Sequence, residues 1–424
     1  MDFGTSGCRA IVIDGHRKIV ARAEVAIAPV VRNNAEVSQD PDIWWEALLG
    51  CIQALGTRCD TGHITHLAID GTSATVLICD SSGRPLAPAL MYNDARATTE
   101  SARIANAAAT DSAAVSASSS LAKILWLLSN TPIPGVAHIQ HQADWLSCKL
   151  TGVFGHSDYH NVLKLGFDPK IDTFPDWIDG LGIKRNWLPQ VHAPGDFIGH
   201  IQPALADRLR LNHQTGILAG TTDSIAAFIA SGAQKIGDAV TSLGSTLVLK
   251  QLSDKPVNSA RFGVYSHRLG KLWLVGGASN SGGSVLRKYF TDEEMTSLSQ
   301  QLQPGKPTGL NYYPLLRSGE RFPVNDPALP PRIEPIPDNN TVFFQALLEG
   351  IAHIEQRGYN LLQELGAPSL KRVFTAGGGS RNKAWAEMRQ AMLGVPVLTA
   401  KFNEAAYGSA LLAAGMTGYL LADQ

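Results

Sequence analysis

The first residues that could take part in chemistry are an acidic residue and a short turn of glycine and hydroxyl residues. Asp2 and Phe3 precede Gly-Thr-Ser-Gly at residues 4–7, and a run of β-forming residues follows. Backbone N–H groups and the hydroxyls of Thr5 and Ser6 suit the oxygens of a phosphate in such a loop. Asp2 is suited to hold Mg²⁺ through water, because Mg²⁺ prefers one or two carboxylates together with phosphate oxygens. The alternative is a hairpin with ordinary turn residues.

Two later glycine clusters are candidate sites for the rest of a nucleotide. Ser-Leu-Gly-Ser-Thr at residues 242–246 is a second hairpin, and Ala-Gly-Gly-Gly-Ser-Arg-Asn at 376–382 follows a predicted strand and precedes a predicted helix. Glycines let the backbone approach a ligand, and a helix N-terminus adds positive potential. A tight turn is the alternative for each cluster. A third glycine cluster, at residues 276–284, superficially suggests a Walker A loop but lacks its lysine. The nucleotide-binding candidates are Gly244, Ser245, Thr246, Gly377, Gly378, Gly379, Ser380 and Asn382.

Candidate residues for a general base and for binding a hydroxyl-bearing substrate lie before residue 234 of the chain. Asp223 begins a predicted helix after a strand and a turn, so it is either a general base or an ordinary helix cap. Tyr92 and Asp94 lie beside Arg96 in a loop, a combination that suits a polyol, although a solvated loop is the alternative.

The elements that position these residues follow an α/β pattern. Alternating or buried apolar runs predict strands over 8–14, 18–27, 66–70 and 75–80. Apolar spacing and capping residues predict helices, with Asp40 as the cap of the first. We expect helices over 40–56, 97–130, 143–152, 341–365 and 404–415, and we interpret 138–145, with His138, His141 and Asp144, as a structural helix rather than a metal site. The two hydroxyl-containing hairpins predict a weak internal repeat with a boundary near residue 234.

Composition narrows the class of protein. The chain has 424 residues, which favours two domains. Its net charge of −1 does not favour electrostatic binding to nucleic acid or to an anionic membrane. Five cysteines without a C-x-x-C pair argue against disulfides and zinc and favour a reducing cytosol. No membrane-spanning run or signal peptide is visible, so we expect a cytoplasmic enzyme with small-molecule partners, either a monomer or a homodimer.

The order of the motifs resembles the FGGY family of carbohydrate kinases, within the actin/Hsp70/sugar-kinase superfamily. DFGTSGCRA is similar to its first phosphate motif, MYNDAR to its W-x-D-x-R segment with Tyr92 where Trp is usual, and GTTDSIAA to its base-carrying segment. ADWLSCKLTG, SLGST and GGGSRNKAW followed by EAAYGSALLAAG resemble later motifs in family order. The resemblance covers nearly the whole chain and is greatest to cyanobacterial and plant pentulose kinases, labelled xylulose-kinase-like and thought to favour D-ribulose.

Two departures from the family pattern matter. Glycerol kinases carry an Arg-Glu pair, and xylulokinases often Met-His, near the segment DGTSAT, where this chain has Ser73. The resemblance thus makes Ser73 a candidate sugar contact. Family members also have a β-strand before the first Asp, where this chain has Met1 alone, so we expect a very short first strand and about half a dozen further residues upstream in the full gene.

The resemblance implies two RNase-H-like α/β domains around an interdomain cleft. The N-terminal domain, residues 1–233, would hold the sugar, the first phosphate motif and the base; residues 234–424 would hold the second phosphate motif and adenosine. The implied reaction is ATP- and Mg²⁺-dependent phosphorylation of a ketopentose, most simply D-ribulose, with catalytic residues Asp223 and Asp2. D-xylulose, a polyol, or a non-catalytic nucleotide switch of the actin/Hsp70 type are the alternatives.

Overall fold

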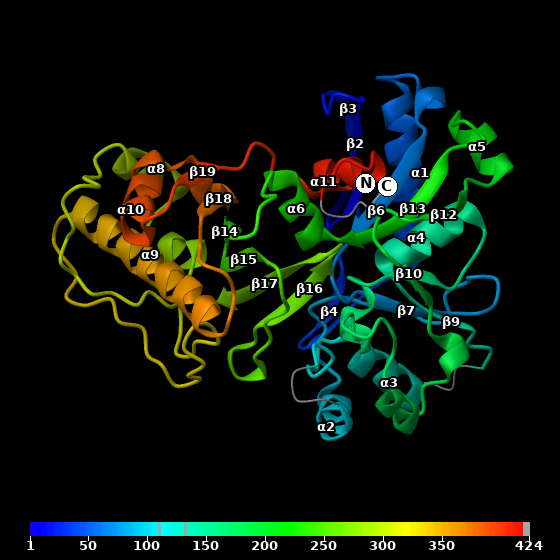
Figure 1. The fold of residues 1–424 in the computed structure, drawn as a ribbon, viewed down its shortest axis with the longest axis horizontal. Coiled ribbons are helices and arrows are strands. Elements are labelled where there is room, and N and C mark those ends of the chain that lie inside the picture. The colour runs from blue at the N-terminus through cyan, green and yellow to red at the C-terminus, as the bar shows by residue number, and fades with distance from the viewer. Residues whose placement is uncertain (109–111, 131–133, 419–424) are drawn as a thin grey trace. The chain divides into compact units, whose positions relative to one another are not determined.

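The computed structural model describes residues 1–108, 112–130 and 134–418, which form two compact units. Unit 1 contains residues 1–230 and the segment from residue 404, and unit 2 contains residues 231–403. The sequence placed the C-terminal segment in the second domain. In the structure its helix α11 (Ala405–Ala413) packs on strands β2 and β6 of unit 1, and Figure 1 shows this red helix beside the blue strands.

Unit 1 is built on a six-stranded sheet in the order β12-β13-β6-β1-β2-β3. Strands β1, β6 and β13 are parallel, whereas β2 and β3 continue from β1 as an antiparallel meander. Leu67 and Ile69 of β6 belong to the core formed with α1, while Ala68 between them contacts Leu412 of α11. Alternate side chains of a strand point to opposite faces, so helices cover both faces of this sheet. The strands are β1 (Asp2–Phe3), β2 (Gly7–Ile13), β3 (Ile19–Ala26), β6 (His66–Gly71), β12 (Phe197–His200) and β13 (Gly216–Thr222).

A second, five-stranded sheet in unit 1 has the order β4-β5-β8-β7-β9 and packs against helix α3. Its strands are β4 (Val31–Asn33), β5 (Glu36–Gln39), β7 (Val76–Cys79), β8 (Ala89–Leu90) and β9 (His138–His141), and a separate parallel pair joins β10 (His156–Asp158) and β11 (Gln190–His192). The helices of this unit are α1 (Pro41–Gly56), α2 (Thr98–Ala107), α3 (Ser120–Asn130), α4 (Gln142–Thr151), α5 (Pro203–Leu209) and α6 (Asp223–Ser231).

Unit 2 repeats the main sheet of unit 1. Its order is β16-β17-β15-β14-β18-β19, with an antiparallel meander on one side of β14 and parallel strands on the other. The strands are β14 (Asp238–Leu243), β15 (Leu247–Ser253), β16 (Tyr265–Leu269), β17 (Leu272–Ser279), β18 (Arg372–Ala376) and β19 (Val397–Thr399). The first strand of each unit therefore leads into an equivalent hairpin, which agrees with the internal repeat expected from the sequence.

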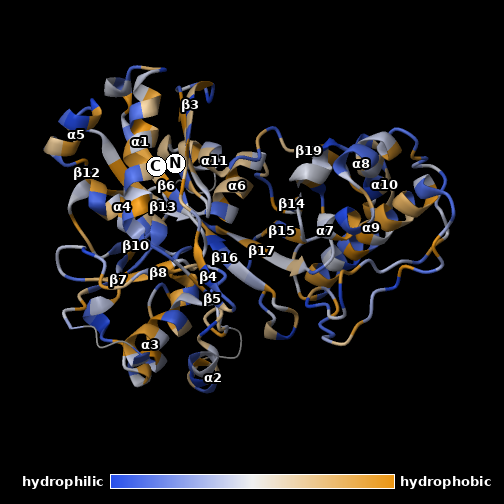
Figure 2. Cartoon of the chain, turned by 180° about the vertical axis from the view of Figure 1, so that it is seen from behind, coloured by the Kyte–Doolittle hydropathy of each residue, from blue (hydrophilic) through white to orange (hydrophobic). Residues whose placement is uncertain are grey.

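Helix α9 (Asn340–Glu364) carries the core of unit 2. Its apolar face packs against β15 and β17, and Figure 2 shows orange and blue segments alternating along it, as the amphipathic pattern predicts. The other helices are α7 (Gly283–Tyr289), α8 (Asp292–Ser299) and α10 (Lys383–Leu393), and short 3₁₀ turns lie at Thr61–His63, Val162–Leu165, Asp176–Leu181, Arg185–Trp187, Ala260–Phe262 and Gly378–Arg381. No helix among the described residues is both long enough and apolar enough to cross a lipid bilayer.

Two expected helices differ in the structure. The stretch from 97 to 130 forms two helices, α2 and α3, because a serine-rich segment interrupts it; part of that stretch lies outside the described residues. The stretch from 138 begins as strand β9 rather than helix, because His138–His141 pairs with β7 across the second sheet. His141 then caps α4, with its Nδ1 atom 3.0 Å from Asp144 Oδ2, so the two side chains of the expected helix do meet, at a helix start.

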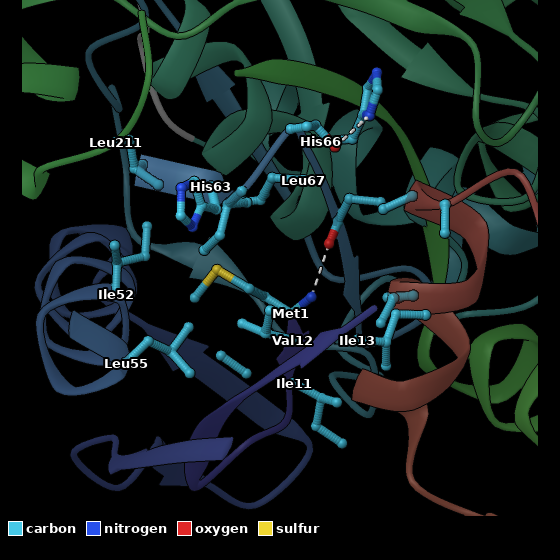
Figure 3. Close-up of a pocket in the computed structure, with 18 residues that line it drawn as sticks. Met1, Ile11, Val12, Ile13, Ile52, Leu55, His63, His66, Leu67 and Leu211 are labelled. Carbon is cyan, nitrogen blue, oxygen red and sulfur yellow. Dashed lines mark hydrogen bonds between the residues drawn. The ribbon is translucent and has the colours of Figure 1, made fainter. Parts of the chain in front are cut away.

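Strand β1 covers only two residues, between β2 and β6. The amino group of Met1 donates to the carbonyl oxygen of Ala68 at 2.7 Å. Beside Met1 lies a cavity of about 140 Å³, lined by residues of β2, β6, α1 and α11. Figure 3 shows Ile11, Val12 and Ile13 of β2 on one side of Met1 and Leu67 on the other.

Candidate active site

Three of the segments predicted for chemistry in unit 1 lie at the ends of three neighbouring parallel strands. Asp2 of β1 and Thr221 of β13 both pair in register with Asp70 of β6. The turn at 4–6 follows β1, and Asp223 follows β13 directly. Since carboxyl ends of parallel strands meet at one edge of a sheet, these groups lie along the same edge, as expected of ligand sites in α/β folds.

A carboxyl pair lies at this edge. Asp2 and Asp70 are both buried and pair in register on neighbouring strands, and Ser409 of α11 donates to Asp70 Oδ2 at 2.5 Å, whereas Asp70 Oδ1 accepts no hydrogen bond from the described residues. Burial, reinforced by the negative charge of Asp2, raises the pKa of Asp70 well above its ordinary value. Burial raises the pKa of Asp2 as well, and the more deeply buried Asp70 is the carboxyl that holds a proton most firmly. The sequence did not single out Asp70.

The charge at this edge suits a hydrated Mg²⁺ ion. Asp2 offers one carboxylate, with Arg9 Nη1 3.9 Å from its Oδ2 atom. In the described parts of the chain, no three His, Cys, Asp or Glu side chains are grouped as a metal cage. Mg²⁺ usually keeps several waters and binds one or two carboxylates plus substrate phosphates. The donor set therefore fits Mg²⁺ held by Asp2 together with nucleotide oxygens, and does not fit a metal held by protein alone.

The first phosphate turn is held by a side chain that the sequence analysis missed. Gln39 Nε2 donates to the carbonyl oxygens of Thr5 and Ala28 at 3.3 and 2.7 Å, and Trp44 Nε1 donates to Gln39 Oε1 at 2.7 Å. Ser6 is exposed and Thr5 is half-buried. Because Gln39 binds a carbonyl oxygen of the turn, it orders the turn without occupying the backbone N–H groups of that turn.

Asp223 is the first residue of α6, and its Oδ1 atom accepts the backbone N–H of Ser224 at 2.6 Å. The side chain is half-buried. The residue thus sits at the start of a helix, as expected from the sequence, with its carboxylate beside the end of β13.

The three sugar candidates occupy two adjacent loops. Ser73 lies in the turn between β6 and β7, and Tyr92 lies in the loop after β8, where its N–H donates to Thr75 Oγ1 at 3.0 Å. Tyr92 is 43% exposed. Asp94 is fully buried, accepts Val37 N at 2.5 Å and pairs with Arg96. Both Asp94 oxygens are thus bound within the protein, so this residue supports the loop rather than offering a vacant acceptor.

The sequence analysis also missed a cluster of buried polar side chains that hydrogen-bonds to Thr221 of β13. Asn161 Nδ2 donates to Asp158 Oδ2 at 2.6 Å and to Thr221 O at 3.3 Å, and His160 Nδ1 lies 2.8 Å from Thr221 Oγ1. Burial raises the pKa of Asp158 to about 8. The segment HSDYHN contains these residues, and its density of polar side chains was the available signal.

Unit 2 brings the two glycine clusters together. Strands β14 and β18 are parallel neighbours with Ser242 opposite Ala376, so the hairpin at 244–246 and the glycine loop at 377–380 leave the sheet side by side. A Cβ atom on Gly377, which has φ +82°, would lie 2.6 Å from Leu243 O. Only glycine fits this left-handed position against the neighbouring backbone.

A cavity of about 770 Å³ lies beside these loops, within the size range of small-molecule sites. The lining includes five of the predicted residues, namely Gly244, Ser245, Gly378, Gly379 and Asn382. Thr246, Gly377 and Ser380 are not among the lining residues; Ser380 instead donates to Gly377 O at 2.7 Å and closes the loop. The other lining residues come mainly from α7, α8, α9 and α10.

The third glycine cluster, for which a tight turn was the interpretation from the sequence, also lies beside this cavity. Gly282 and Gly283 line the cavity, and Gly283 N donates to Gly244 O at 2.8 Å. A Cβ on Gly283 would lie 2.7 Å from the same oxygen. The cluster therefore braces the second hairpin, a role that its sequence could not reveal because the contact joins residues nearly 40 apart.

Family models match both units. The model of the FGGY family of carbohydrate kinases, N-terminal domain, matches residues 1–230, and that of the C-terminal domain matches residues 239–416. The chain belongs to the FGGY family of carbohydrate kinases. It is therefore a carbohydrate kinase with the two-domain α/β sugar-kinase fold expected from the sequence, and family membership implies ATP as the phosphoryl donor.

Relatives of this kinase are distant but match nearly its whole length. Xylulose kinase of Bacillus subtilis (strain 168) is 24% identical, covering 99% of this chain and 88% of that protein. Gluconokinase of the same organism is 19% identical, covering 99% and 87%. A crystal structure described as a "xyloylose kinase" from Brucella ovis superposes with a TM-score of 0.88 at 25% identity, covering 98% of this kinase and 89% of that chain. Glycerol kinase of Plasmodium falciparum with ADP has the same fold, with a TM-score of 0.86 at 20% identity over 100% and 89%.

Proposed function

We propose that this kinase transfers the γ-phosphoryl group of ATP to the terminal hydroxyl of a ketopentose, with D-ribulose as the preferred sugar. The observation that carries the sugar assignment is Ser73, a small hydroxyl residue in the turn after β6. The resemblance places the Arg-Glu pair of glycerol kinases, and the Met-His that xylulokinases often carry, near this position, and those side chains are larger than serine. A serine leaves room for the sugar and offers one hydroxyl to it.

Asp223 accepts the proton of the attacking hydroxyl. A carboxylate at the start of α6 and at the end of β13 lies on the same sheet edge as Asp2 and the first phosphate turn. Ser73 and Tyr92 orient the sugar. Asp94 supports the loop that carries Tyr92 through its hydrogen bonds with Arg96.

The nucleotide is divided between two sets of residues. Thr5 and Ser6 with Gly244, Ser245 and Thr246 bind the β- and γ-phosphates, and the loop from Gly377 to Asn382 receives adenosine. The 770 Å³ cavity beside that loop supports this assignment. Asp2 is the residue that would hold Mg²⁺, whose charge neutralises phosphate oxygens during transfer.

Asp223→Asn tests the base. General-base catalysis contributes about 10²–10⁴-fold, so we expect kcat for sugar phosphorylation to fall by about that factor. The affinity for MgATP should barely change, and Asn still caps a helix, so the fold should persist. Asp207→Asn, which changes an exposed carboxylate bound to His213, is the matched control and should retain full activity. Near-normal phosphorylation by Asp223→Asn would leave this residue an ordinary helix cap.

A coupled assay of ADP release tests the substrate. We expect the highest kcat/KM for D-ribulose among D-ribulose, D-xylulose, gluconate, glycerol and other polyols. The second candidate is D-xylulose, which the names of several relatives favour. A higher kcat/KM for D-xylulose would replace the assignment, and sugar-independent ATP hydrolysis throughout would favour a nucleotide switch.

A further inference from the structure

We infer that Lys123, in the interior of unit 1, is a positioning residue for the sugar: its ammonium group ties together the two loops that carry Ser73 and Tyr92. This inference rests on the proposed function, because that function assigns the two loops to the sugar. Lys123 donates its hydrogen bonds to the residues next to Ser73 and Tyr92, so it acts through the loop backbones.

The contacts of the ammonium group link both loops directly. Lys123 Nζ donates to the carbonyl oxygen of Ala74 at 2.6 Å and to that of Met91 at 2.7 Å. Ala74 follows Ser73, and Met91 precedes Tyr92. The side chain is completely buried, and such lysines are rare unless their charge is compensated. One ammonium group thus sets the spacing between the backbones on either side of the proposed sugar contacts.

The turn that carries Ser73 needs an external tie. Ala74 adopts φ +73°, a left-handed conformation that is unfavourable for a residue with a Cβ atom. The carbonyl group of this residue is one of the two that accept from Lys123. The ammonium group therefore holds the least favourable residue of the turn in place.

A second link joins the same loops. Thr75 Oγ1 accepts the N–H of Tyr92 at 3.0 Å and lies 2.5 Å from Thr72 Oγ1. Thr72 is fixed in turn by Gln142 Oε1, which accepts its N–H at 3.0 Å. The two loops are therefore joined by a hydroxyl network as well as by the ammonium group.

Helix α3 is itself anchored, so that it provides a fixed origin for the lysine. His141 Nε2 lies 2.9 Å from the hydroxyl of Ser120, the first residue of the helix, and His141 Nδ1 lies 3.0 Å from Asp144 Oδ2. These side chains are buried. The nearby carboxylate Asp94 pairs with Arg96, which leaves the ammonium group of Lys123 to the loop carbonyls.

Lys123→Met tests the inference because it should change KM for the sugar but not KM for ATP. Loss of the tie should misplace Ser73 and Tyr92, and a misplacement of about 1 Å can reduce a rate about 10²-fold. We expect KM for the sugar to rise about 10–100-fold while KM for ATP stays within about twofold, because the nucleotide cavity lies in unit 2. Lys149→Met, which changes a lysine of α4 bound to Asp42, is the control and should shift neither constant.

Amide hydrogen exchange gives a readout that does not depend on the sugar. In Lys123→Met we expect faster exchange in peptides covering 72–75 and 91–94, with unchanged exchange over 377–382. Glycine at position 74 removes the steric penalty of the left-handed turn, so Ala74→Gly should recover part of the sugar KM in the Lys123→Met background.

The outcomes separate this inference from the proposed function. A wild-type protein that phosphorylates another sugar overturns the D-ribulose assignment, and the KM split is then measured on that sugar. Unchanged sugar KM and loop exchange in a folded Lys123→Met, or an equal rise in both KM values, would overturn the inference. If Lys123→Met does not fold, Thr75→Val decides: it breaks the second link without stranding a charge, and the same KM split supports the loop tie, whereas no split removes it.

Discussion

The protonation state of Asp70 decides which substitutions position 70 tolerates. Because burial and the charge of Asp2 keep Asp70 neutral, its carboxyl group has one acceptor oxygen, which binds Ser409, and one O–H donor. An asparagine has the same donor and acceptor. We therefore expect Asp70→Asn to keep the free energy of unfolding at pH 7 close to that of the wild type in urea titrations.

Asp70→Leu is the contrasting variant. Leucine matches the volume but leaves the buried hydroxyl of Ser409 without its partner, and an unsatisfied buried polar group costs about 1–3 kcal/mol. Equal stabilities of the Asn and Leu variants would mean that the hydrogen bonds of Asp70 contribute nothing.

Lys123 gives the unfolding free energy a defined pH dependence. Burial lowers the pKa of Lys123 to about 7, opposed by the charge of Asp94 and assisted by Lys164 and Arg96. The ordinary lysine pKa of about 10.4 applies to the unfolded chain, so between these values the unfolded chain binds a proton that the folded one lacks. Stability contributed by Lys123 therefore rises with pH between about 7 and about 10.4, and it is lost as pH falls across the same interval.

The difference between wild type and Lys123→Met isolates this contribution. We expect the unfolding free energy of the wild type, relative to the variant, to increase from pH 7 to pH 9 in urea titrations. A constant or falling difference would show that the lysine keeps its proton in the folded protein.

At the scale of elements, the glycine loop after β18 separates ligand binding from folding. A Cβ on Gly378 would meet nothing within 4 Å, whereas one on Gly379 would lie 2.7 Å from the Trp385 ring and 2.8 Å from Leu243 Cβ. Gly378 lines the cavity. We expect Gly378→Val to weaken ATP binding at least tenfold by calorimetry, with sugar binding and the melting temperature largely unchanged.

Gly379→Ala is the control in the same loop. Its methyl group meets the protein, so it should lower the melting temperature, overpacking costing about 1–3 kcal/mol. Unfolding of Gly378→Val, or equal loss of both ligands, would make residue 378 a structural turn only.

At the scale of the whole molecule, the proposed function assigns different parts of one reaction to the two units. The proposed base and sugar contacts belong to unit 1, and the cavity proposed for the nucleotide belongs to unit 2. Transfer to the sugar rather than to water requires that water be kept from the nucleotide until the acceptor hydroxyl is bound, and closure of loops or domains on the substrate is one way in which enzymes achieve this.

We therefore expect the sugar to raise ATP turnover well above basal hydrolysis. ADP release measured with and without D-ribulose checks this, and the Asp223→Asn variant should lose the stimulation while retaining basal hydrolysis. Turnover that no sugar in the panel changes would favour the nucleotide switch.

Much of this protein could be predicted from the sequence, because its signals are local. Asp40 caps α1 by accepting Asp42 N, and Gly152 ends α4 at φ +79°, both as the capping patterns indicate. The family was recognisable because turns that bind phosphate need particular residue types at fixed spacing. The hydroxyl hairpins also predicted the repeat that the two sheets share.

Tertiary structure alone decided the contacts between residues far apart in the chain. It brought α11 onto unit 1, placed Gly283 against Gly244, and put His138 in a strand. It also buried Asp70 and Lys123, whose proton affinities depend on the removal of water and on neighbours that no sequence window contains. Motif spacing is sufficient to specify a turn, whereas desolvation and long-range hydrogen bonds exist only once the chain has folded.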